Sequence, residues 1–79
     1  MSRRGFTDVF VEDDLVKIVI DIRGIEAKDL YLGISTKGNS LIVKYVKTNV
    51  VLEIPIPVTV TDQFDWFVNN GVLAVEIKR

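Results

Sequence analysis

The side chains that could carry out acid–base or metal chemistry gather at one place, Glu12-Asp13-Asp14, and the chain contains neither histidine nor cysteine. Without these two residue types, Ser–His and Cys–His nucleophile pairs are excluded. Two carboxylates can act as acid and base only where their surroundings separate their pKa values. Three consecutive acidic residues also supply too few further oxygen donors for a calcium loop. We therefore interpret the cluster as a solvent-exposed turn, and predict no enzyme, no metal and no cofactor.

The residues on either side of this turn alternate between apolar and polar side chains, which indicates β-strands with one buried face. If Asp13-Asp14 forms a two-residue hairpin loop, the apolar side chains of the two strands pair on one face. This register sets Val11 opposite Val16 and Val9 opposite Ile18.

The middle of the chain predicts two more hairpins on the same grounds. Gly38-Asn39 suits a two-residue turn whose first residue needs a positive φ, and Thr48-Asn49 suits the next loop. The first loop sets Ile34 opposite Val43 and Leu32 opposite Tyr45. The second sets Tyr45 opposite Leu52, Val43 opposite Ile54, and Lys44 opposite Glu53.

The end of the chain predicts a hairpin with Asn70-Gly71 as a type I′ turn. It pairs apolar residues throughout: Val68 with Leu73, Trp66 with Val75, and Phe64 with Ile77. Only "GIEAKDL" has the character of a helical turn. About seven strands with turns at short intervals predict an all-β protein, an immunoglobulin-like antiparallel β-sandwich.

Length and charge limit the organisation and the partners. The 79 residues suffice for one domain, expected over residues 6–79 behind a flexible N-terminal segment of residues 1–5. A net charge of −1 favours neither nucleic acid nor an anionic membrane, and Phe64 and Trp66 are expected to point inward rather than to stack on bases. No signal peptide or membrane-spanning run is visible, so we expect a cytoplasmic protein.

Apolar side chains also fall on the outward parity of the middle strands, at Tyr31, Ile42, Val46 and Val51. The expected registers pair Tyr31 with Val46 and Val46 with Val51, which predicts a contiguous outer apolar patch. Phe67 is expected to point outward as well. Such a patch is typical of a partner surface, although a terminal segment or a second copy could cover it.

Pro55 and Pro57 stand two residues apart, so their missing N–H groups lie along the same edge of the strand. Pairing along that edge is expected to stop at the prolines. We interpret them as residues that protect an apolar strand from aggregation.

Three segments resemble the α-crystallin domain of small heat-shock proteins. "TDVFVEDDLVKIVIDIRGIEAKDLYLGI" looks like the opening of that domain, "LEIPIPVTV" resembles its "x-[IL]-P-x-P-V" strand, and "WFVNNGVLAVEIKR" resembles its "A-x-x-x-N-G-V-L" signature. The three segments occur in the family's order, and the resemblance covers residues 6–79.

The resemblance implies an immunoglobulin-like sandwich that holds partly unfolded client proteins without ATP. It also implies a groove that receives a short I-x-I segment. Carried over by position, the residues expected to line this protein-binding groove are Leu30, Leu32, Ile34, Phe64, Trp66 and Val68.

The sequence departs from the family in several places. Trp66 replaces a small alanine, and Arg23 stands where proline is common. Residues 47–49 form a short connection where some members insert a loop with an exchanged strand, so that dimer mode is not expected. Ile54-Pro55-Ile56 matches the letters of I-x-I, but it lies inside a strand. With no long N-terminal arm and no C-terminal I-x-I tail, we expect a monomer or small homo-oligomer rather than a large assembly.

Two functions remain open at this stage. One is a minimal holdase chaperone of the small heat-shock type. The alternative is an adaptor similar to the CS co-chaperone domain, a compact sandwich that binds one specific protein partner. Aggregation assays and mass measurements would separate the two.

Overall fold

A computed structural model gives the fold of residues 7–79; the expected flexible segment, residues 1–5, lies outside the described residues. Seven strands and one short 3₁₀ helix make up the described chain. Their bounds are β1 Thr7–Val11, β2 Leu15–Asp21, η1 Ala27–Asp29, β3 Leu30–Ile34, β4 Ser40–Tyr45, β5 Val50–Pro55, β6 Phe64–Asn69 and β7 Val72–Lys78. The helix η1 lies inside "GIEAKDL", so the predicted helical turn is confirmed.

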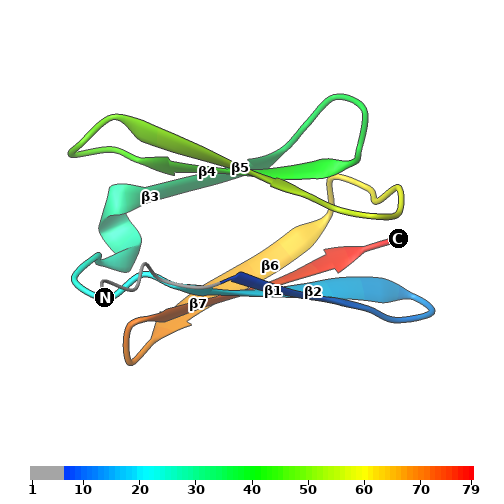
Figure 1. Ribbon diagram of the computed structural model, residues 1–79, viewed down its shortest axis with the longest axis horizontal. Helices are drawn as coiled ribbons and strands as arrows, with labels where there is room; N and C mark the ends of the chain where they lie inside the picture. The colour runs from blue at the N-terminus through cyan, green and yellow to red at the C-terminus, as the bar shows by residue number, and fades with distance from the viewer. Residues whose placement is uncertain (1–6) are drawn as a thin grey trace, which may run out of the picture.

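The strands form two antiparallel sheets that face each other as separate layers (Figure 1). One sheet has four strands in the order β1-β2-β7-β6, and the other has three in the order β3-β4-β5. The chain crosses between the sheets after β2 through η1 and again after β5. The all-β sandwich predicted from the alternating pattern is therefore confirmed.

The core lies between the sheets and is built from alternate residues of the central strands. In β2 every second residue is buried, and β7 has the same alternation up to Ile77. This is the expected consequence of period-two sequences whose apolar parity faces the opposite sheet. The buried apolar residues are Val16, Ile18, Ile20, Ile22, Leu30, Leu41, Val43, Ile54, Ile56, Val60, Leu73, Val75 and Ile77.

The first and the last hairpins have the predicted registers. In the first, Val9 pairs with Ile18 and Val11 with Val16. In the last, Phe64 pairs with Ile77, Trp66 with Val75 and Val68 with Leu73. The turn residues Asn70 and Gly71 both have positive φ, 52° and 78°, as a type I′ turn requires.

The two middle hairpins differ from prediction by two residues. Ile34 pairs with Leu41 rather than Val43, and Leu32 pairs with Val43 rather than Tyr45. In the next hairpin Leu52 pairs with Val43 rather than Tyr45. Lys44 pairs with Val51, not with the predicted Glu53, and Glu53 pairs with Ile42.

The reason is that both loops are longer than two residues. The first loop closes where the backbone N–H of Ser35 donates to the carbonyl of Ser40 at 3.0 Å. In the second, the N–H of Asn49 donates to the carbonyl of Tyr45 at 2.7 Å, and Asn49 adopts a left-handed φ of 60°. A shift of two residues leaves every side chain on its predicted face, because the side-chain period of a strand is two.

Candidate protein-binding surfaces

The acidic cluster is the exposed turn between β1 and β2, as predicted. Glu12 lies 3.7 Å from the ammonium group of Lys17, and its backbone carbonyl accepts a hydrogen bond of 2.7 Å from the guanidinium of Arg79. The ion pair ties the turn to β2, and the bond from Arg79 holds it against the end of β7. Across residues 7–79, no group of three or more acidic, histidine or cysteine side chains is placed to hold a metal ion.

The six residues predicted to line a groove lie on the two strands β3 and β6, at one edge of each sheet. Their side chains belong to the inward parity. Leu30 is buried in the core, whereas Leu32, Ile34, Phe64, Trp66 and Val68 are half-buried and pack against it. The two edge strands thus present incompletely covered apolar side chains. Trp66 is less buried than a central core residue, because β6 has a neighbour on one side only.

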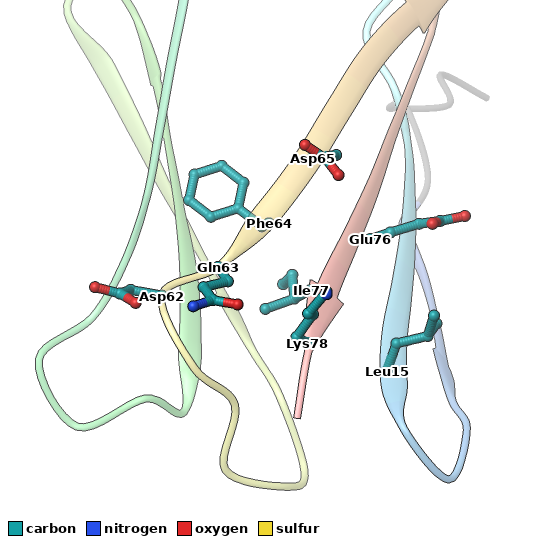
Figure 2. A pocket seen from close by; sticks show the side chains of 8 residues that line it. All are labelled: Leu15, Asp62, Gln63, Phe64, Asp65, Glu76, Ile77 and Lys78. Carbon is teal, nitrogen blue, oxygen red and sulfur yellow. The ribbon is translucent and has the colours of Figure 1, made fainter.

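An open cavity of about 400 Å³ lies where β6 begins and β7 ends (Figure 2). Its lining mixes apolar residues with three carboxylates: Leu15, Asp62, Gln63, Phe64, Asp65, Glu76, Ile77 and Lys78. Asp65 and Glu76 are paired directly across the two strands, and both are exposed. Figure 2 shows the Phe64 ring and the Asp65 carboxylate leaving β6 in different directions. The cavity therefore has the apolar side chain of Phe64 on one side and the carboxylates of Asp65 and Glu76 on the outer face of β6 and β7.

In the structure, the residues predicted to form one outer patch do not lie side by side. Lys44, not Val46, stands between Tyr31 and Val51, because the registers of the two middle hairpins are shifted. Val46 lies in the turn after β4, and Ile42 is half-buried between Gly33 and Glu53. The predicted pairs of Val46 with Tyr31 and with Val51 are therefore wrong.

Four of the patch residues remain strongly exposed, including Val46 at 54% in the turn after β4, but they do not share one face. Tyr31 is 71% exposed and Val51 55% exposed, both on the outer face of the three-stranded sheet. Phe67 is 60% exposed on the four-stranded sheet, beside Asp65. Exposed apolar side chains thus lie on the outer faces of both sheets.

Sequence reasoning missed the apolar exposure of β5 and β1. Val50 and Leu52 have the inward parity but are 44% and 37% exposed, because β5 is an edge strand that the opposite sheet covers incompletely. Phe10 and Val11 on β1 are exposed as well. The exposure of Phe10 was predictable, because strand alternation alone places its side chain outward. The exposure of Val50 and Leu52 was not, because it depends on how the two sheets overlap.

A small cavity of about 170 Å³ lies at the end of the sandwich where η1 joins β3. Tyr45 lines it, and burial raises the pKa of its hydroxyl above the usual value of 10.0. The ammonium of Lys47 lies 3.6 Å from the carboxylate of Asp29 at the same site. This ion pair and the hydrogen bond from the N–H of Val46 to the carbonyl of Asp29 fix the turn after β4.

Comparison with known proteins gives a likeness in structure only. No protein-family profile matches the sequence, and no curated protein matches it. Among solved structures, a point mutant of hsp14.1 from Sulfolobus solfataricus superposes with a TM-score of 0.76 at 22% identity, over 92% of this chain and 69% of that one. Heat shock protein 16.0 from Schizosaccharomyces pombe also gives a TM-score of 0.76, at 16% identity, over 95% of this chain and 66% of that one.

The chain therefore has the β-sandwich fold of small heat-shock proteins, in agreement with the α-crystallin-domain resemblance of its sequence. It spans about two thirds of each of these two structures. None of the helices among the described residues is long and apolar enough to cross a membrane.

Proposed function

We propose that the protein is a minimal holdase chaperone of the small heat-shock type, which binds partly unfolded proteins without ATP. The observation that carries the proposal is the set of large apolar side chains left exposed on a rigid sandwich, at Tyr31, Val51 and Phe67 above all. Exposed apolar surface of this kind is typical of a site for protein partners. The likeness in fold to two heat-shock proteins supports the same function.

This function requires the binding of apolar surface rather than catalysis. A client that begins to unfold exposes apolar side chains in extended segments, and these gain free energy by covering apolar surface on a partner. The half-buried side chains of β3 and β6 extend this apolar surface along an edge of the sandwich. We include the groove residues Leu32, Ile34, Trp66 and Val68 in the proposed client surface for that reason. A cytoplasmic location is part of the same proposal.

The test is suppression of aggregation of a heat-labile client enzyme, followed by light scattering. The variant Tyr31→Ser/Val51→Thr removes apolar surface from one outer face, and we expect weaker protection of the client. Asp8→Asn is a matched control, because Asp8 is also exposed on a sheet but is polar. Far-UV circular dichroism and thermal unfolding check that all forms stay folded. Full protection by the double variant would refute the role of this face.

The wild-type protein separates the two classes of function. A chaperone protects several unrelated clients when present in amounts comparable to theirs. If the wild type protects no client and instead binds one cellular protein tightly in a pull-down, the holdase proposal fails. A CS-like adaptor then becomes the better account, consistent with the short turn between β4 and β5.

A further inference from the structure

Lys44 has apolar neighbours in every direction on the outer face of the three-stranded sheet. Across the strands it pairs with Tyr31 of β3 on one side and with Val51 of β5 on the other. Along its own strand the residues of the same outward parity are Ile42 before it and Val46 just after β4. We call these five residues the Lys44 face. Its central member is a cation, and the four residues around it are uncharged.

The charge of Lys44 is not matched by a carboxylate of the same molecule. Among residues 7–79, no ion pair and no side-chain hydrogen bond involves Lys44. Glu53 lies on the same face, but the register sets it opposite Ile42, diagonally to Lys44. Both charged side chains are exposed, so water solvates them in the free protein. The unpaired ammonium therefore becomes important only when a partner covers the face.

A partner that covers the apolar residues around Lys44 must also remove water from the ammonium group. Loss of that water without a compensating charge is unfavourable, because an ammonium ion is strongly hydrated. A carboxylate placed over Lys44 replaces the lost water with a charge-assisted hydrogen bond. The face therefore complements a partner that is apolar around one negative charge, and it disfavours a partner that is wholly apolar or basic.

We propose that the Lys44 face binds extended client segments of the pattern apolar-x-acidic-x-apolar, and that Lys44 determines this specificity. The inference rests on the proposed function, because Tyr31 and Val51 belong to the proposed client surface. In an extended segment every second side chain points the same way, about 6.6 Å apart. The same spacing separates Val46, Lys44 and Ile42 along β4. The acidic side chain then lies over Lys44, and the two apolar side chains lie over Val46 and Ile42.

Peptide binding to the wild-type protein tests the charge preference. The probe is a fluorescent peptide with leucine, glutamate and leucine at alternate positions, separated and flanked by serine. Two matched peptides carry glutamine or lysine in place of the glutamate. By fluorescence anisotropy we expect the glutamate peptide to bind about three- to tenfold more tightly than the glutamine peptide, and the lysine peptide to bind most weakly. Equal affinity for the three peptides would overturn the proposal.

Two lysine variants assign the preference to one residue. Lys44→Met removes the charge and keeps a long side chain, so the glutamate and glutamine peptides should bind it equally. Lys78→Met is the matched control, since Lys78 is an exposed strand lysine on the other sheet and its loss changes the net charge equally. It should keep the preference, and loss of the preference in both variants would show a general charge effect instead. Thermal unfolding checks that both variants stay folded.

A third variant and the position of the bound peptide give independent tests. Glu53→Gln removes a negative charge beside Lys44, so the glutamate peptide should bind this variant more tightly than the wild type. In the ¹⁵N-labelled protein, the glutamate peptide should shift amide signals along β4. Shifts confined to β3 and β6 would place the peptide in the predicted groove and contradict the assignment to the Lys44 face.

The peptide experiments and the aggregation assay can fail separately. Client protection by a protein that shows no charge preference would refute this inference and leave the holdase proposal standing. The preference for the glutamate peptide without protection of any client would have the opposite meaning. If both hold, Lys44→Met should protect clients with less regard to their acidic segments than the wild type does.

Discussion

Gly38 lies at the point where the loop between β3 and β4 meets the connection from β5 to β6. Its carbonyl accepts a hydrogen bond of 2.8 Å from the N–H of Val60, and its φ is +70°. A Cβ atom at this position would lie 2.6 Å from the carbonyl oxygen of Val60, a distance that cannot be kept. Gly38→Ala must therefore strain the backbone and also move one of the two loops.

A matched substitution separates the two causes of the expected loss of stability, backbone strain and steric conflict. Gly24 has a φ of +86°, but nothing lies within 4 Å of the place where its Cβ would be. Gly24→Ala should therefore cost only the left-handed backbone strain of an L-residue, about 1–2 kcal/mol. Gly38→Ala adds the steric conflict and the weakened hydrogen bond to Val60, about 1–2 kcal/mol more. We expect a total loss of about 2–4 kcal/mol.

Thermal and denaturant unfolding measure the difference. For a domain of this size about 1 kcal/mol lowers Tm by roughly 4–8 °C, so Gly38→Ala should melt clearly below Gly24→Ala. Gly33→Ala completes the series, because its Cβ would also meet nothing within 4 Å and its φ is not positive. It should change stability little. Equal losses at Gly38 and Gly24 would show that the two loops do not approach each other as described.

Three further predictions concern single side chains. Trp66→Ala should lower the free energy of unfolding by about 2–3 kcal/mol, less than for a fully buried tryptophan, because Trp66 is half-buried; unchanged stability would contradict its inward orientation. The raised pKa of Tyr45 means that the folded state keeps the phenol proton more tightly than the unfolded chain does. The free energy of unfolding should therefore fall as pH rises above about 10, and it should fall less steeply in Tyr45→Phe. Phe67→Ser should weaken client protection additively with Tyr31→Ser/Val51→Thr, because the sites lie on different sheets; strong non-additivity would indicate one shared site.

The hairpin of β6 and β7 was predictable because two independent signals agree there. Asn70-Gly71 specifies a two-residue turn, and a slip to a three-residue loop that sets Asp65 against Val75 would mix the two faces. The hairpin of β3 and β4 offered no such check. Its glycine also has a positive φ, but it lies in a longer loop closed by Ser35 and Ser40. A shift by two residues leaves every side chain on the same face, so the apolar pattern cannot distinguish the two registers.

The candidate surfaces were predictable only as far as they depend on parity. Alternation correctly placed Tyr31, Val51 and Phe67 on outward faces, and all three are exposed. Which residues lie side by side depends on the register, and there Lys44 took the place expected for Val46. The exposure of Val50 and Leu52 depends on the overlap of two sheets whose strands are far apart in sequence. No local pattern carries that information.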